Sequence, residues 1–210
     1  MVLAALAKNE VELKVAQYKV CREWQETYNG ILLVFLPDTF GTTQFLKNAP
    51  EWLNYWAGAR PDSKKALPTE GTALTGGDEL INFWNGRGLD AREKLIIFAD
   101  GLDVKLPGHT AQGEDICEIY DYYNGRVKIG FGFGTMFTND FLDCHPMAPN
   151  EMKPLSLVCK VEFVEYNGIH RETVKLSDNF TKATTGSDAE LERYRAAFGF
   201  EGMENAPVMV

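Results

Sequence analysis

The sequence has no long hydrophobic run and no excess of basic residues. No apolar stretch approaches the roughly 18 residues of a membrane span, and the start has neither a basic region nor a cleavage site. Lysine and arginine number 21 against 30 aspartates and glutamates, a formal net charge of −9. This charge argues against nucleic acid or an anionic membrane as the main partner. We expect a soluble, non-exported protein in which an anionic ligand needs local cations or backbone amides.

Cysteine and histidine are scarce and unclustered. Four cysteines form no CxxC pair, and three histidines show no HxxxH spacing, so we expect no structural zinc site and assign no metal ligand. Widely spaced cysteines fit a reducing, cytoplasmic compartment. No serine, cysteine or lysine has a recognisable nucleophile context. The residues concerned are Cys21, Cys117, Cys144, Cys159, His109, His145 and His170, and we expect the histidines to be exposed.

Short apolar runs, each followed by a polar or glycine-bearing turn and a helix, recur along the first two thirds of the chain. This is the βα repeat of a parallel sheet, so the predicted class is α/β. The expected strands are 31–36, 57–60, 95–98 and the start of 127–135. The expected helices are an uncapped one from 1 to 28, one after 38 that is interrupted at Pro50, 78–88 capped by Asp78, 112–123, and 189–198 closed by Gly199.

The pattern changes after Thr138-Asn139-Asp140. Residues 154–166 and 172–176 predict a hairpin that turns at Asn167-Gly168, and residues 201–210 predict a loose tail. We therefore divide the chain into an α/β part, 1–150, and a part with a hairpin and a helix, 151–210. Residues 64–77 are expected to form a loop.

A stretch of alternating glycines, Val127–Thr135, is the strongest sign of a ligand site. Glycine can adopt positive φ and brings backbone N–H groups close to a ligand, and N–H groups that point the same way bind phosphate. The alternative is a strand that another backbone crosses closely.

Two more polar clusters follow predicted strands. Arg60-Pro61-Asp62-Ser63 offers a cation for a carboxylate, phosphate or aromatic ring and a carboxylate for ribose, or else a helix cap beside a surface arginine. Asp100 follows four apolar residues, where a carboxylate is costly unless it is paired or functional; the alternative is an N-cap. Because carboxyl ends of parallel strands lie at one edge, these clusters predict one site for a phosphorylated sugar with a flat anionic ring beside it.

Other polar residues have ordinary explanations. Thr39, Thr42 and Thr43 fit turns and caps as well as an anion site, and Lys160 and Lys175 fit a solvated face better than a phosphate contact. The four tryptophans, at helical spacings, predict core packing: Trp24, Trp52, Trp56 and Trp84.

Five motifs in order resemble the nicotinate phosphoribosyltransferase family. They are Leu36-Pro37-Asp38-Thr39-Phe40-Gly41-Thr42-Thr43, Arg60-Pro61-Asp62-Ser63, Ala99-Asp100-Gly101-Leu102-Asp103, Phe131-Gly132-Phe133-Gly134-Thr135 and Lys175-Leu176-Ser177-Asp178-Asn179. The resemblance runs from about Val2 to Gly199 and matches only the C-terminal half or so of such an enzyme, which agrees with the uncapped first helix.

The resemblance implies a type II phosphoribosyltransferase fold, here a partial irregular (β/α) barrel with a hairpin and helix from a smaller mixed domain. It implies that nicotinate and phosphoribosyl pyrophosphate give nicotinate mononucleotide and pyrophosphate, coupled to ATP hydrolysis and assisted by Mg²⁺ that accompanies phosphoribosyl pyrophosphate. In the family a phosphorylated histidine promotes turnover, and we expect its motif just ahead of Met1. The expected assembly is a homo-oligomer, or completion by that upstream portion.

Carried over by motif, the resemblance gives seven contact residues. Asp62 and Asp100 are the expected catalytic carboxylates. Arg60 would face the pyridine, Asp62 the ribose, and Asp100 and Gly101 the ribose and phosphate; Gly132, Gly134 and Thr135 would cradle the 5′-phosphate.

The sequence departs from the family pattern at two places. Asp62-Ser63-Lys64-Lys65 stands where the family often has Asp-Ser-Gly-Asp, which adds cations, and Ala99 stands where many members have serine. Two alternatives stay open. One is a truncated, non-catalytic module that binds a phosphorylated ligand, and the other is a related transferase that uses nicotinamide or quinolinate.

Overall fold

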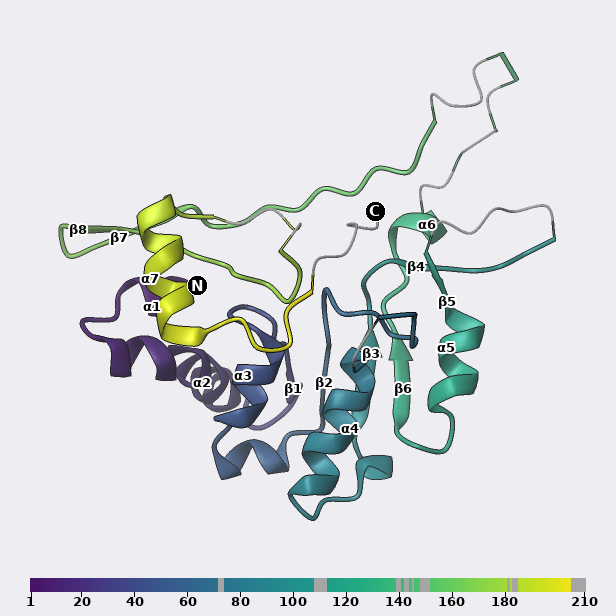
Figure 1. The fold of residues 1–210 in the computed structure, drawn as a ribbon, viewed down its shortest axis with the longest axis horizontal. Coiled ribbons are helices and arrows are strands. Elements are labelled where there is room, and N and C mark those ends of the chain that lie inside the picture. The colour runs from purple at the N-terminus through teal and green to yellow at the C-terminus, as the bar shows by residue number, and fades with distance from the viewer. Residues whose placement is uncertain are drawn as a thin grey trace.

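A four-stranded parallel sheet forms the centre of the molecule. The computed structural model describes residues 1–71, 74–107, 113–138, 141, 144, 146–147, 152–180, 182 and 185–204. The sheet order is β1 (Val34–Phe35), β2 (Gly58–Ala59), β3 (Leu95–Phe98) and β6 (Lys128–Phe131), and every neighbouring pair is parallel (Figure 1). The predicted α/β class is confirmed. The strands form an open row within the described part of the chain, so the expected barrel is not confirmed.

Helices and short strands complete the fold. The helices are α1 (Val2–Ala5), α2 (Glu10–Thr27), α3 (Thr42–Lys47), α4 (Gly76–Gly86), α5 (Ile116–Tyr123), α6 (Thr135–Thr138) and α7 (Asp188–Phe198), with 3₁₀ turns Glu51–Tyr55 and Ala91–Glu93. A parallel pair joins β4 (Leu102–Asp103) to β5 (Glu114–Asp115), and an antiparallel hairpin joins β7 (Phe163–Tyr166) to β8 (Ile169–Glu172). No helix in the described ranges is both long enough and apolar enough to span a bilayer.

The register of the sheet depends on a glycine in β2. Gly58 pairs with Leu95, and a Cβ at this position would lie 2.0 Å from the Leu95 carbonyl oxygen. No side chain fits there, so β2 and β3 can approach to hydrogen-bonding distance. In β3 the run LIIF buries Ile96 and Phe98, which fixes that strand against the core.

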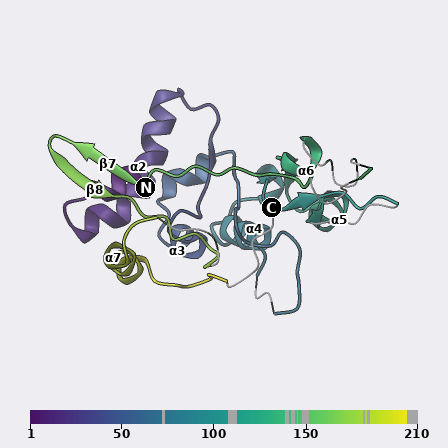
Figure 2. The ribbon, with the colours of Figure 1, turned by 90° about the horizontal axis from the view of Figure 1, so that it is seen from above.

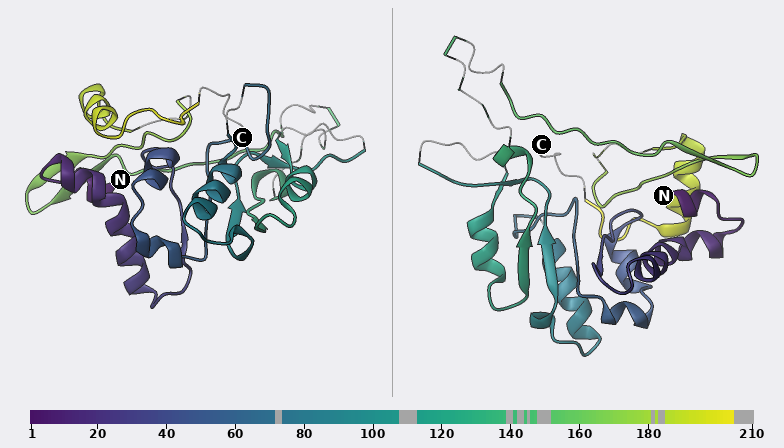
Figure 3. Two further views of the ribbon diagram at one scale, coloured as in Figure 1. Left: turned by 60° about the horizontal axis from the view of Figure 1, so that its bottom comes forward. Right: turned by 180° about the vertical axis from the view of Figure 1, so that it is seen from behind.

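Two hydrophobic clusters hold the molecule together. The larger packs β1–β3 against α4 and α5 and includes Trp56, Trp84 and Tyr123. The smaller joins the first and last parts of the chain, because Leu13 and Phe40 pack with Val174, Tyr194 and Phe198. In Figures 1 and 3, α1 and α2 accordingly lie beside α7, which follows them by more than 150 residues.

The tryptophans differ in burial. Trp56 and Trp84 are buried and Trp52 packs against the same cluster, as predicted. Trp24 is 41% exposed, so its predicted core position is wrong. It lies near the end of α2, where its indole N–H donates to the Leu32 carbonyl at 3.0 Å.

Several element boundaries differ from the prediction. The helix α5 begins at Ile116 rather than at residue 112, and the hairpin strands are 163–166 and 169–172 rather than 154–166 and 172–176, although the turn between them is as predicted. Three further differences have a clear local cause. The first helix is two helices, because the side chain of Asn9 caps α2 at Glu12. Residues 31 and 32 are exposed and precede β1, since Leu32 adopts φ +55° and turns the chain. Thr75, and not Asp78, caps α4, which begins at Gly76 inside the expected loop.

The C-terminal part wraps over the sheet. Residues 152–162 run in extended form above the sheet toward the confirmed β7–β8 hairpin (Figures 1 and 2). Gly199 ends α7 as predicted. The tail is anchored at Glu204, whose N–H donates to the Asp178 carbonyl at 2.7 Å, so the loose tail is wrong as far as that residue. The expected division at residue 150 stays a prediction.

Candidate phosphoribosyl site

A cavity of about 520 Å³ opens at the carboxyl ends of β2, β3 and β6. All seven residues singled out from the sequence line it: Arg60, Asp62, Asp100, Gly101, Gly132, Gly134 and Thr135. Ser156, Val158 and Lys160 of the extended segment close one side, and Lys175 and Lys182 close another. The prediction that three successive strand ends meet around one hollow is confirmed as geometry.

The end of β2 supplies Arg60 and Asp62. The Arg60 amide still bonds to Phe35 of β1, at 2.9 Å, and Pro61 then turns the chain so that both side chains enter the cavity. One Arg60 guanidinium nitrogen lies 3.7 Å from Asp62 Oδ1. No helix begins at Asp62, so the alternative of a helix cap is wrong here.

The end of β3 supplies Asp100 and Gly101. Asp100 Oδ2 accepts the Ser63 N–H at 3.1 Å, which ties this strand end to that of β2. The next element is the strand β4, so Asp100 caps no helix. Gly101 has φ +59°, and its carbonyl accepts the Glu114 N–H at 2.7 Å. Glycine therefore allows the sharp turn that leaves Asp100 facing the cavity.

Gly132 and Gly134 follow β6, and neither is needed there for a positive φ. Neither Gly132 nor Gly134 has a positive φ, which corrects the sequence argument. A Cβ on Gly132 would lie 2.9 Å from the Ala99 Cβ, so the close approach of β3 and β6 requires glycine. A Cβ on Gly134 would have no protein atom within 4 Å. Because Gly134 lines the cavity, its missing side chain leaves space for a ligand.

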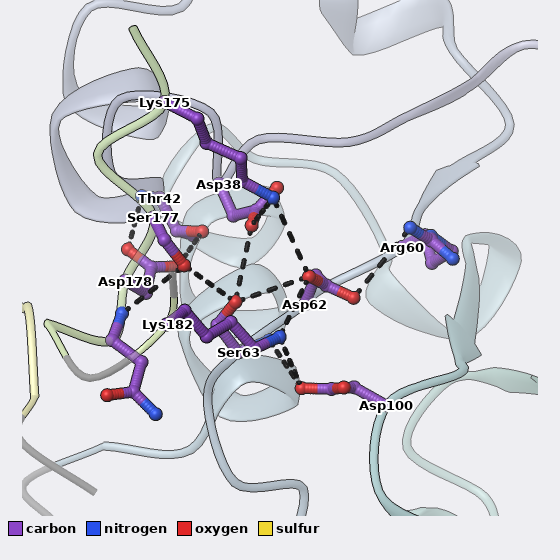
Figure 4. Close-up of polar contacts among 11 residues, drawn as sticks. Asp38, Thr42, Arg60, Asp62, Ser63, Asp100, Lys175, Ser177, Asp178 and Lys182 are labelled. Atoms are coloured by element: carbon purple, nitrogen blue, oxygen red, sulfur yellow. Dashed lines mark hydrogen bonds and ion pairs between the residues drawn. The ribbon is translucent and has the colours of Figure 1, made fainter. Parts of the chain in front are cut away.

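Lys175 and Lys182 complete a row of alternating charges that sequence reasoning missed. Figure 4 shows the order Asp38, Lys175, Asp62, Lys182 and Asp100. Lys175 Nζ lies 2.8 Å from Asp38 and 3.9 Å from Asp62, and Lys182 Nζ lies 3.2 Å from Asp62 and 2.8 Å from Asp100. We call this row the charge ladder. Both lysine side chains are only 17% exposed, so the solvated face predicted for Lys175 is wrong.

Burial and the neighbouring cations shift the pKa values of Asp62 and Asp38 in opposite directions. Burial alone would raise the pKa of Asp62, but the ammonium groups of Lys182 and Lys175 and the Arg60 guanidinium outweigh it and lower that pKa. Burial raises the pKa of Asp38, which is fully buried, although Lys175 opposes the shift. Asp62 is therefore held as an anion at neutral pH.

Two serines beside the charge ladder are in the left-handed region. Ser63 has φ +71° and Ser177 has φ +65°, and their hydroxyls are 2.8 Å apart. The Ser63 hydroxyl also contacts Asp38 and Asp62, at 3.3 and 3.2 Å. Backbone strain of this kind persists where surrounding contacts hold it and is common at functional sites.

The threonine cluster has a structural role. The Thr42 N–H and hydroxyl donate to Asp178 at 2.7 and 2.5 Å, and the Thr43 hydroxyl donates to Glu79 at 2.5 Å. Carboxylates of the chain itself thus take the positions that an anionic ligand would need. We call the Asp178–Thr42 contact the anchor, because it joins residues 136 positions apart.

The described residues offer no ready metal centre. They contain no group of three or more histidine, cysteine, aspartate or glutamate side chains that could hold an ion. His170 is exposed on β8 and stacks on Phe163, away from the residues that line the cavity. His109 and His145 lie outside the described residues.

A family model matches residues 2–201, and its description is the nicotinate phosphoribosyltransferase (NAPRTase) family. This chain belongs to that family. It is similar to the crystal structure of a nicotinate phosphoribosyltransferase from Vibrio cholerae, with 31% identity and a TM-score of 0.71 over 95% of this chain. It is also similar to the one from Porphyromonas gingivalis, with 26% identity and a TM-score of 0.70 over 94%.

The chain spans less than half the length of these solved structures. The matches cover 42% of the Vibrio chain and 44% of the Porphyromonas chain. Family membership is therefore established for this chain, whereas the activity of the whole enzyme is not established by it.

Proposed function

We propose that the cavity binds phosphoribosyl pyrophosphate and that the chain contributes this site to the synthesis of nicotinate mononucleotide from nicotinate. The observation that carries the proposal is the meeting of three strand ends in one cavity within a member of this family. The charges support it. Among the side chains that line the cavity, Arg60, Lys160, Lys175 and Lys182 are cationic and Asp62 and Asp100 are anionic. A chain with a net charge of −9 thus concentrates cations where an anionic substrate would bind.

In this proposal Asp62 and Asp100 accept hydrogen bonds from the ribose hydroxyls. Gly101, Gly132, Gly134 and Thr135 surround the 5′-phosphate, and Arg60 faces the pyridine ring or its carboxylate. The pyridine nitrogen forms a bond to the ribose carbon while the bond from that carbon to diphosphate breaks, and diphosphate leaves with the electron pair. Fixed carboxylates favour the positive charge that develops on the sugar, so positioning and electrostatics supply the acceleration.

Mg²⁺ and ATP belong to the proposal for the whole reaction. The described residues do not form a Mg²⁺ site by themselves, because the cavity carboxylates are engaged by lysines. We therefore assign Mg²⁺ to the diphosphate of the substrate and derive no step through it. No described histidine lines the cavity, so the coupling to ATP is assigned to no residue of this chain.

Two measurements on the same preparation test the proposal. Isothermal titration with phosphoribosyl pyrophosphate and Mg²⁺ should show saturable binding, and an assay with nicotinate and ATP should show nicotinate mononucleotide. Absence of phosphoribosyl pyrophosphate binding would overturn the assignment of the cavity. Binding without product would favour a non-catalytic ligand-binding module, and product from nicotinamide or quinolinate alone would reassign the pyridine substrate.

A further inference from the structure

Lys182 occupies a place that two carboxylates usually give to a metal ion. Its ammonium lies 2.8 Å from Asp100 Oδ2 and 3.2 Å from Asp62 Oδ2, so one oxygen of each carboxylate points at the same position. The three residues come from separate parts of the chain, since Lys182 is 120 and 82 positions from its partners. Only the fold creates this arrangement (Figure 4).

Carboxylates that converge in a partly buried cavity need a positive charge between them. Without one, mutual repulsion drives a proton onto one member of the pair, or a divalent cation binds there. The side chains of Asp62 and Asp100 are 15% and 32% exposed, so solvent screens their repulsion incompletely. The charge from Lys182 is permanent at neutral pH and arrives with the fold, whereas a metal ion would have to be recruited.

We propose that Lys182 is a positioning residue that replaces a metal ion between Asp62 and Asp100, aligns both carboxylates for the ribose and keeps free divalent cations out of the ligand-free cavity. The role of the carboxylates toward ribose in this inference rests on the proposed function. The exclusion of cations rests only on the geometry of the ladder. Lys175, 3.9 Å from Asp62, reinforces the exclusion from the next position in the row.

Binding of Mn²⁺ to the ligand-free protein tests the inference directly. Electron paramagnetic resonance follows the signal of free Mn²⁺ as purified protein is added, with no substrate present. Wild type should leave the signal almost unchanged. Lys182→Met should bind Mn²⁺ at least about tenfold more tightly. The variant lacks the positive charge that lies about 3 Å from both carboxylates and repels Mn²⁺, and its loss changes the Coulomb energy of Mn²⁺ in the site by more than about 1.4 kcal/mol. Lys182→Ala should give the same gain if the methionine variant folds poorly, as circular dichroism would reveal.

Three matched variants separate position from net charge. Lys182→Arg keeps a cation between the carboxylates and should behave like wild type. Lys128→Met removes the same charge at the opposite end of β6 and should also behave like wild type. Lys182→Met combined with Asp100→Asn should lose the gain. Equal Mn²⁺ affinity in wild type, folded Lys182→Met and folded Lys182→Ala would overturn the inference. A gain in affinity that survives the addition of Asp100→Asn to Lys182→Met would also overturn it.

The outcome is independent of the proposed function. Phosphoribosyl pyrophosphate takes no part in the Mn²⁺ titration, so failure of wild type to bind that substrate would remove the proposed function and leave the cation measurement intact. Conversely, substrate binding by wild type without a gain in Lys182→Met would remove only the inference about Lys182.

Discussion

The anchor and the charge ladder are neighbouring carboxylate networks with opposite chemistry. In the anchor, neutral donors of Thr42 hold Asp178, which is fully buried. In the ladder, ammonium groups hold Asp62 and Asp100, which border a cavity. Burial raises the pKa of Asp178 to about 7, although Lys64 and Thr42 oppose the shift, whereas cations lower the pKa of Asp62. Carboxylates from three different motifs are therefore used in one place to join segments and in the other to line a cavity.

The largest effect that we expect is the pH dependence of stability that the anchor residue Asp178 causes. Because the folded-state pKa of Asp178 is raised above its ordinary value of 3.8, folding favours the protonated carboxyl. The stabilisation of the fold by protonated Asp178 is fully present below about pH 4 and is lost as the pH rises through about 7. The free energy of unfolding should change by on the order of 4 kcal/mol over this range. Asp178→Asn keeps an oxygen acceptor for Thr42 and cannot ionise, so this loss should disappear.

Urea denaturation of wild type and Asp178→Asn between pH 4 and pH 8 measures the difference. Asp121→Asn, on the exposed side of α5, is the control and should follow wild type. The same pH dependence in wild type and Asp178→Asn would show that Thr42 and Lys64 compensate for burial, and the contrast between anchor and ladder would then be one of exposure only.

A second prediction tests the cavity at Gly134. Gly134→Val places two methyl groups in the cavity at a position where a Cβ meets no protein atom, so stability should change little. Affinity for phosphoribosyl pyrophosphate should fall more than about 100-fold, because the side chain takes the space assigned to the phosphate. Gly86→Val makes the same change at another position with no atom within 4 Å and away from the cavity. Unchanged affinity in Gly134→Val would remove the phosphate assignment.

The contrast between the two regions also explains what the sequence could predict. Arg60, Asp62, Asp100 and Gly134 were found because each follows a short apolar run, and parallel strands bring such positions to one edge. Lys182 follows no strand and has no periodic neighbours, and its partners are 82 and 120 positions away. In the sequence, Lys182 is distinguished only by its position seven residues after Lys175, which begins the last motif.

Local boundaries failed where one residue overrides an apolar pattern. Composition makes residues 1–28 look like one helix, but Asn9 caps a new helix within it. The apolar run 31–36 looks like one strand, but the left-handed turn at Leu32 leaves only Val34–Phe35 in the sheet. Gly132 and Gly134, which follow β6, line the cavity as predicted, but the reason for glycine there is close approach and open space rather than positive φ.

The smallest effect that we expect comes from a substitution of Asp100 in the ladder. Asp100→Asn keeps the size of the side chain and an acceptor oxygen for the Ser63 N–H, but it removes the charge beside Lys182. A charged hydrogen bond of about 1.5–3 kcal/mol to a ribose hydroxyl should be weakened, so affinity for phosphoribosyl pyrophosphate should fall about 10- to 100-fold. Stability should change by less, because the carboxylate is 32% exposed and its ion pair is screened.

Titration calorimetry and urea denaturation on the same samples compare the two losses for Asp100→Asn. Asp90→Asn, which removes an exposed carboxylate paired with Arg92, is the control and should leave affinity unchanged. Where the protein also makes nicotinate mononucleotide, turnover in Asp100→Asn should fall further than stability does. Equal losses in affinity and stability would place Asp100 with Asp178 as a structural carboxylate, and the distinction between ladder and anchor would no longer hold at that position.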